Sequence, residues 1–189
     1  MRYEEFTIEG RNAVLEAFRA GRPIDKLFVQ DGCKDGPVQT IVREARKHDT
    51  VIQFVARERL DQMSDTGKHQ GVIAYAAAYE YAEVEDILKL AEEKGEPPFI
   101  FLLDGIEDPH NLGAIIRTAN LAGAHGVIIP KHRASGLTAT VARTSAGALN
   151  YTPVARVTNL ANTIEDLKKR GLWFVCADMG GELMYKLNL

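Results

Sequence analysis

The sequence has only two cysteines, few aromatic residues and no long apolar run. Cys33 and Cys176 form no CxxC or similar ligand spacing, which argues against a zinc site. The longest apolar runs, such as 99–103 and 127–129, are far shorter than the roughly 20 residues that a membrane span needs. The opening MRYEEFTIEG lacks the apolar core of a secretory signal. We therefore expect no membrane span, no metal and a reducing cytoplasm in which both thiols are buried.

Acidic residues are absent between Asp108 and Glu165, although the net charge of the chain is −3. A local excess of positive charge inside an acidic protein favours a phosphate-binding face. The alternative is a chance gap among loops and buried helices. The gap keeps five basic residues, which are Arg117, Lys131, Arg133, Arg143 and Arg156.

The first part of the chain predicts a small α/β domain over residues 1–76. Apolar residues recur at helical spacing after Gly10 and after Pro37, and both segments are expected to be helices. Short runs rich in β-branched or aromatic residues predict strands at 26–30, 51–55 and 71–77. Residues 77–96 are expected to be a linker with one amphipathic helix that stops at Gly95.

Residues 97–189 predict a second α/β domain, because strand and helix patterns alternate along it. Such alternation is typical of a parallel sheet covered by helices. Asn159 is placed to cap the last helix, and Gly171 to end it. We expect strands at 99–103, 126–129, 154–157 and 173–177, with helices at 112–122 and 139–146 and after Asn159.

The segment 103–120 leaves a buried strand through a polar loop and enters a helix. Ligands of parallel sheets bind at such strand ends. If Asn111 lies in the loop or at the helix cap, its amide and the Arg117 guanidinium could converge on one ligand. The plainer interpretation makes Asn111 a helix cap and Arg117 a solvated charge.

The stretch Asn111-Leu-Gly-Ala-Ile-Ile-Arg117-Thr-Ala resembles the first motif of the SpoU (TrmH) branch of the knotted RNA methyltransferases. The resemblance continues through Gly123-Ala-His-Gly-Val-Ile-Ile-Pro130 and Arg143-Thr-Ser-Ala-Gly-Ala-Leu149. In the first domain, Gly10-Arg-Asn-Ala-Val-Leu-Glu-Ala-Phe18 and His69-Gln-Gly-Val72 are similar to the RNA-binding extension of longer members. The resemblance therefore covers essentially the whole chain.

This resemblance implies a ribosomal-protein-like RNA-binding domain followed by a Rossmann-like domain of the knotted SPOUT class. It implies transfer of a methyl group from S-adenosylmethionine to a ribose 2′-hydroxyl, with a guanosine of 23S ribosomal RNA as the expected target, by a homodimer. Arg117 matches the active-site arginine of the family and Asn111 its partner asparagine. Because arginine keeps its proton, we expect Arg117 to grip a phosphate beside the target ribose instead of acting as a base.

Four residues of the acid-poor stretch are expected to contact RNA phosphates, although each charge could equally be a solvated one. The small Ser145 could instead allow two helices to pack closely. The expected RNA contacts are Lys131, Arg133, Arg143 and Ser145.

The family pattern has two later motifs, Gly-Ser-Glu-Gly and Ser-Leu-Asn-Val-Ser, which build most of the donor pocket and the knot, and this sequence ends at Leu189 before both. Only the turn at Ala177 and Asp178 is expected to line the donor site. The 189-residue chain alone is therefore expected to be inactive, with a domain truncated before the knot. A non-catalytic RNA-binding protein is the main alternative. An α/β enzyme that uses a nucleotide or another phosphorylated ligand is a weaker alternative, because the sequence has no nucleotide-binding glycine motif.

Overall fold

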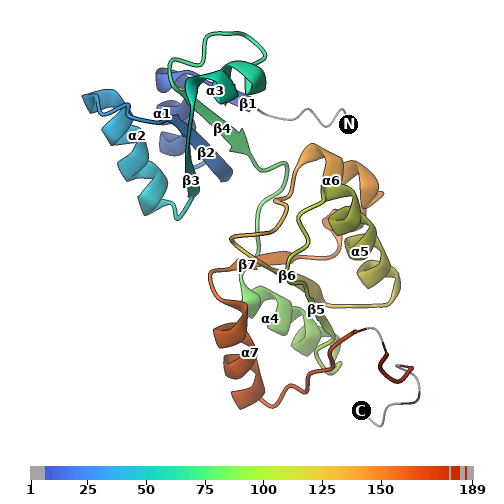
Figure 1. Cartoon of the computed structure of the whole chain (residues 1–189). Helices are drawn as coiled ribbons and strands as arrows, with labels where there is room; N and C mark the ends of the chain where they lie inside the picture. Colours follow the sequence, from blue (N-terminus) through green and yellow to red (C-terminus); the bar gives the residue numbers. More distant parts are fainter. Residues whose placement is uncertain (1–6, 179, 184–185, 187–189) are drawn as a thin grey trace.

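The computed structural model describes residues 7–178, 180–183 and 186, and these form two separate β-sheets (Figure 1). The first sheet has the strand order β1-β4-β2-β3. Strands β2 and β3 are parallel, whereas β4 runs antiparallel to both β1 and β2. The elements of this first unit are β1 (Thr7–Glu9), α1 (Arg11–Arg19), β2 (Ile24–Gln30), α2 (Gly36–Lys47), β3 (Val51–Val55), α3 (Arg57–Met63) and β4 (Val72–Ala76).

Helices cover both faces of the first sheet. Leu27 and Val29 of β2 face α1 and α2, and both are fully buried. Phe28, which lies between them, faces the opposite side and packs against Leu60 of α3. This alternation follows from the period of two along a strand. The predicted strands of this unit are confirmed within one or two residues, while β1 and α3 were not expected from the sequence.

The second unit contains a three-stranded sheet in the order β5-β6-β7, and both strand pairs are parallel, as predicted. None of the helices in the described part of the chain is long and apolar enough to cross a membrane. The elements of this second unit are α4 (Val84–Lys94), β5 (Ile100–Leu102), α5 (Pro109–Leu121), β6 (Gly126–Pro130), α6 (Ala139–Thr144), the 3₁₀-helix η1 (Ala148–Asn150), β7 (Val154–Val157) and α7 (Leu160–Lys169).

The central strand β6 is buried on both faces, which explains why its sequence is uniformly apolar. Val127 and Ile129 pack under α5 and α6, whereas Ile128 packs under α4 and α7. Figure 1 shows these two pairs of helices on opposite sides of the sheet. Gly126 opens the strand beneath α4, where a Cβ atom would lie only 2.6 Å from the Ile87 side chain.

Side-chain caps set where most helices of the second unit begin. The Asp108 carboxylate accepts a hydrogen bond from the His110 N–H, and Pro109 follows it at the first helical position of α5. Thr138 caps α6. Asn159 accepts from the Asn162 N–H and begins α7, as predicted. The loop from β5 therefore ends at Asp108, three residues before Asn111.

The strand predicted at 173–177 is wrong. The segment keeps an alternating pattern: Leu172 and Phe174 are half-buried against the cluster under α4 and α7, while Trp173 is 93% exposed. It forms no backbone ladder with the three described strands, however, and no secondary structure is assigned to it. The alternating apolar residues pack on one side of the segment, against the α4–α7 cluster, without forming a strand.

Gly113 allows α5 to pack closely on α6. A Cβ atom at this position would lie 2.7 Å from Thr144 Cβ and 2.9 Å from the Val141 carbonyl oxygen. Both distances are shorter than the contacts that real Cβ atoms make, and the second involves backbone, which moves little. The glycine of the Asn-Leu-Gly motif is therefore required by helix packing.

We predict that Gly113→Ala lowers the free energy of unfolding by about 1–3 kcal/mol, because the added methyl group overpacks the α5–α6 contact. Gly36→Ala is the matched control, since Gly36 is also helical and a Cβ there would meet nothing within 4 Å. Chemical denaturation of both variants measures the difference. Equal unfolding midpoints would show that α6 moves away at no cost.

Candidate functional site

Helix α5 carries both residues of the expected active-site pair. Asn111 lies in the first turn of the helix, so it is neither in the loop nor at the cap, where Asp108 stands instead. Arg117 follows less than two turns later on the same helix, and both residues are exposed. Six residues of helix separate them by about 9 Å along the axis and about 120° around it. Within one chain, their side chains therefore leave α5 in different directions.

The Arg117 guanidinium is available for a ligand. It forms no ion pair or side-chain hydrogen bond with any other residue that the structure describes. A planar guanidinium can bind a phosphate through two parallel hydrogen bonds. Helix α5 thus presents an anion-binding arginine and, in a different direction, the primary amide of Asn111.

Two of the basic residues in the acid-poor stretch pair with acids of the first unit. Lys131, just after β6, forms an ion pair with Asp49, and its side chain is only 8% exposed. Arg156 of β7 donates a hydrogen bond to Asp25 Oδ1 at 2.9 Å, and its side chain is 17% exposed. These two basic residues of the acid-free stretch are therefore neutralised by acids from elsewhere in the sequence.

Asp25 is the centre of the contact between the two units. Its Oδ1 accepts one hydrogen bond from Arg156 and another, 2.5 Å long, from the Tyr81 hydroxyl. Tyr81 comes from the segment between the units and also accepts a hydrogen bond from the Leu137 N–H. The Arg156 guanidinium stacks 4.3 Å from the centre of the Tyr81 ring. A Cβ atom at Gly136 would lie 2.6 Å from Asp25 Cγ, so the second unit closes directly over this carboxylate.

Burial dominates the electrostatics of this contact. Burial raises the pKa of the Asp25 carboxyl, while the Tyr81 hydrogen bond and the Arg156 charge oppose the shift. Burial, together with the Asp25 charge, also raises the pKa of the Tyr81 phenol, which therefore stays protonated and donates. Sequence patterns missed this cluster. The one available signal was an aspartate inside the apolar strand β2, where aspartate is disfavoured.

The structure treats the other expected RNA contacts differently. Arg133 and Arg143 are exposed, and Arg133 sits at a left-handed backbone position with φ of 56°. Ser145 is fully buried, and its hydroxyl donates to the Ala142 carbonyl at 3.0 Å. A Cβ on Gly113 would lie 3.1 Å from the Ser145 nitrogen, so Ser145 occupies the close helix contact. Only the two arginines of this set present charge to solvent in this structure.

The residues expected to line the methyl-donor site, Ala177 and Asp178, lie in exposed chain that follows no strand. Two exposed residues of this kind do not by themselves enclose a ligand, since binding pockets bury most of their ligand's surface. Ala177 and Asp178 alone therefore do not fit a bound methyl donor. Among the described residues, no group of three His, Cys, Asp or Glu side chains is placed to hold a metal.

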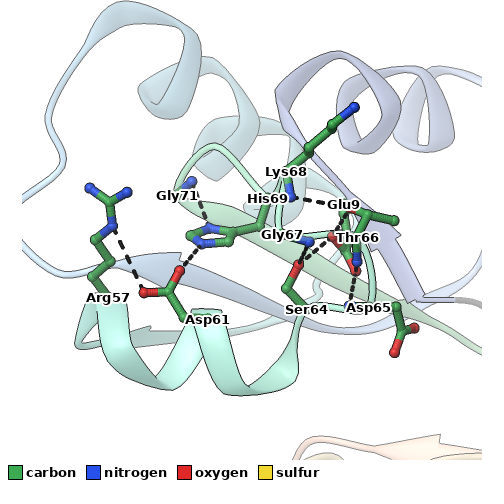
Figure 2. Close-up of polar contacts among 10 residues, drawn as sticks. All are labelled: Glu9, Arg57, Asp61, Ser64, Asp65, Thr66, Gly67, Lys68, His69 and Gly71. Atoms are coloured by element: carbon green, nitrogen blue, oxygen red, sulfur yellow. Dashed lines mark hydrogen bonds and ion pairs between the residues drawn. The ribbon is translucent and has the colours of Figure 1, made fainter.

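The His69-Gln-Gly segment forms a tightly hydrogen-bonded loop before β4 (Figure 2). His69 Nδ1 accepts a hydrogen bond from the Gly71 N–H, so Nε2 carries the proton and donates to Asp61 at 2.8 Å. Gln70 has a left-handed φ of 51° between them. The Gln70 side chain accepts from the Arg11 N–H, and the Arg11 guanidinium donates to the Gln70 carbonyl. The two first-unit motifs that the sequence singled out therefore meet in space.

Glu9 holds the other side of the same loop. Its carboxylate accepts hydrogen bonds from the side chains of Ser64 and Thr66 and from the Asp65 N–H, as Figure 2 shows. Although partial desolvation raises the pKa of Glu9, these hydrogen bonds outweigh it and lower the pKa below its ordinary value. The loop is thus fixed by side chains of β1, α3 and the loop itself.

The cysteines differ from expectation. Cys176 is exposed and Cys33 is half-buried, so the prediction of two buried thiols is wrong for Cys176. The Cys33 Sγ atom lies 3.4 Å from Asp35 Oδ2 in the loop that follows β2.

Fold and site together define a two-unit α/β protein with an arginine-bearing helix after the first strand of a parallel sheet. Family models match both units. Residues 7–82 match the "RNA 2'-O ribose methyltransferase substrate binding" model, and residues 98–189 match the "SpoU rRNA Methylase family" model.

Relatives of known name agree with this class. The chain is 54% identical to the Bacillus subtilis protein named "Putative TrmH family tRNA/rRNA methyltransferase YacO", over 89% of this chain and 68% of the relative. A Staphylococcus aureus protein with the same family name is 44% identical over 97% of this chain and 73% of its own length. The chain belongs to the SpoU (TrmH) family of RNA methyltransferases.

Among solved structures, the chain is similar to the SpoU methyltransferase AviRb from Streptomyces viridochromogenes, which was crystallised with AdoMet. The identity is 22% and the TM-score 0.41, over 88% of this chain and 60% of that one. An AdoMet-bound rRNA methyltransferase from Sinorhizobium meliloti matches at 23% identity and a TM-score of 0.40, over 87% of this chain and 58% of that one. The chain spans about 60% of the length of these structures.

We predict that Asp25→Ala lowers the free energy of unfolding by about 3–5 kcal/mol, because it leaves the Arg156 charge and the Tyr81 hydroxyl buried without an acceptor. Glu16→Ala is the control. It breaks an exposed ion pair with Arg19 and should cost at most about 1 kcal/mol. Denaturant unfolding measures both. A loss for Asp25→Ala no larger than that for Glu16→Ala would show that the contact does not hold the two units together.

Proposed function

We propose that this protein transfers a methyl group from S-adenosylmethionine to a ribose 2′-hydroxyl of RNA, and that the first unit recognises the RNA. Membership of the family, with matches to the substrate-binding model and to the methylase model on the two units of one chain, is the observation that carries this proposal. S-adenosylmethionine enters as the methyl donor of the family, and it would supply the methyl group on a sulfonium.

Arg117 is the residue of this chain that we assign to the reaction. Its guanidinium is exposed and has no acidic partner among the described residues, so it can bind the phosphate beside the target ribose. Holding that phosphate fixes the direction of the 2′-hydroxyl and stabilises negative charge that develops on its oxygen. Asn111, in the first turn of the same helix, is an exposed amide that leaves α5 in another direction, and we propose that it contacts the same nucleotide or the next one.

Finer features follow the family resemblance. We propose a guanosine of 23S ribosomal RNA as the target and a homodimer as the working form. Two free thiols are compatible with the reducing cytoplasm that we propose as the site of action.

The proposal is tested on the protein at the full length of its relatives, since this chain spans 68% of the Bacillus subtilis relative. That protein is incubated with labelled S-adenosylmethionine and either ribosomal or transfer RNA, and 2′-O-methyl groups are then mapped by their resistance to alkaline cleavage. Label at a guanosine ribose of the large-subunit RNA is the expected result. RNA binding with no methyl transfer to either RNA would favour the non-catalytic RNA-binding alternative instead. Methyl groups on a base would contradict the assigned chemistry.

We predict that, in the same full-length protein, Arg117→Ala lowers the rate of methylation by about 100- to 1,000-fold, the loss typical when one oriented donor is removed from a reacting oxygen. Folding should be unaffected, because the side chain is exposed. Binding of S-adenosylmethionine, followed by calorimetry, should be nearly unchanged. Arg19→Ala removes an exposed helical arginine of the first unit and serves as the control. Turnover retained in the Arg117 variant would remove this residue from the mechanism.

A further inference from the structure

A groove lies between α2 and the edge strand β3 of the first unit. It is open to solvent and has a volume of about 760 Å³. Its apolar part is formed by Val38 and Val42 of α2 and by the ring of Phe54 on β3. A cavity of this size is in the range that accommodates small organic ligands, and a nucleotide falls within that range. We call it the Phe54 groove.

Register explains why an aromatic ring is exposed here. Phe54 pairs with Val29 in the parallel ladder, so it faces the side of the sheet that α1 and α2 cover. Because β3 is the outermost strand, α2 covers Ile52 but leaves Phe54 55% exposed. The ring is therefore held by a strand and presented to solvent beside a helix.

Basic side chains line the same groove as the ring. Lys34, Arg43 and Arg46 line the groove and are exposed, and none of them forms an ion pair or a side-chain hydrogen bond with another described residue. Of the groove residues, only Asp31 is acidic. Arg43 and Arg46 are three residues apart on α2, so their side chains lie on one face of the helix. An acidic protein thus leaves three free cations around one exposed aromatic ring.

A second open pocket of about 510 Å³ also has Cys33 in its lining. Two arginines line it, but Arg11 forms an ion pair with Asp35 and Arg57 one with Asp61. Lys68 of this pocket has no ionic partner among the described residues. With Lys34, Arg43 and Arg46 it makes four such cations over two pockets, which match a chain of phosphates better than an isolated anion.

We infer that the Phe54 groove binds an unpaired segment of the substrate RNA, with one nucleobase stacked on Phe54 and the flanking phosphates held by Lys34, Arg43 and Arg46. Proteins that hold single-stranded RNA combine an aromatic platform with a positively charged track, and the groove has both. This inference rests on the proposed function, because it names the part of the first unit that recognises the RNA. A paired duplex would present no free base to the ring.

Binding of two probes tests the inference. The first is a short RNA hairpin with an unpaired loop, and the second is the fully paired duplex of the same stem, both followed by fluorescence anisotropy. Phe54→Ala should weaken binding of the hairpin by roughly 5- to 150-fold, the range expected when one base no longer stacks on an aromatic ring. The same variant should leave duplex binding nearly unchanged. Phe54→Tyr should restore hairpin binding, because the ring is kept.

The basic residues of the groove should affect the salt dependence of RNA binding. The double variant Arg43→Ala with Arg46→Ala should weaken hairpin binding and reduce the dependence of log affinity on log salt by about 0.7 for each phosphate that the protein no longer neutralises. Phe54→Ala should leave that dependence unchanged. Phe99→Ala and Arg19→Ala are the controls, since they remove a partly exposed aromatic ring of the second unit and an exposed arginine outside the groove.

The outcomes separate the groove from the proposed function. If the wild-type protein methylates RNA and the Phe54→Ala variant binds the hairpin as tightly as the wild type, the role of the groove is wrong and the proposed function is kept. Selective loss of hairpin binding in Phe54→Ala supports the groove even if no methyl transfer is found. Equal loss for hairpin and duplex would also overturn the stacking role, and thermal unfolding confirms that each variant is folded.

Discussion

The arrangement of the molecule depends on one buried carboxylate. Asp25 belongs to the first sheet, Tyr81 to the connecting segment and Arg156 to the last strand of the second sheet, and all three meet through Asp25 Oδ1. The remaining oxygen, Asp25 Oδ2, is buried without a hydrogen-bond partner, so the site is not optimised for stability alone. Loss of one side chain of the cluster would lower the stability of the fold, because a buried charge left without its partner is costly. Such a contact favours one relative placement of the two units.

This constraint also determines which charges remain for a ligand. Lys131 and Arg156 neutralise acids of the first unit, and so they belong to the contact between units. Positive charge without an ion pair to a described residue remains on α5, on α6 and in the loop before α6, and also in the Phe54 groove of the first unit. An RNA molecule that reaches both places would be held by the first unit while its target ribose lies at Arg117. The contact between the two units would then set the distance between the Phe54 groove and Arg117.

Local patterns in the sequence predicted most of the fold. Apolar periodicity, capping residues and terminating glycines are local signals, and they located β2, β3, β6, β7 and α7 closely. They failed where the outcome depends on distant residues. Residues 173–177 have the composition of a strand, but a strand needs a partner. Asn111 was expected before the helix, but Asp108 and Pro109 begin α5 earlier. Asp25 and Phe54 gave little signal, because one acquires its role from residues 56 and 131 positions away and the other from lying on the sheet edge. The roles of Asn111, Arg117, Arg133 and Arg143 in RNA binding stay predictions.

The most direct test of the account is ultraviolet cross-linking of the protein to ribosomal RNA, with the linked peptides identified by mass spectrometry. If one RNA molecule contacts both units, we predict cross-links to a single RNA region from both, near Phe54 in the first unit and near Arg117 in the second. Cross-links confined to the first unit would contradict the claim that one RNA spans recognition and chemistry. Cross-links confined to the second unit would contradict the assignment of recognition to the first.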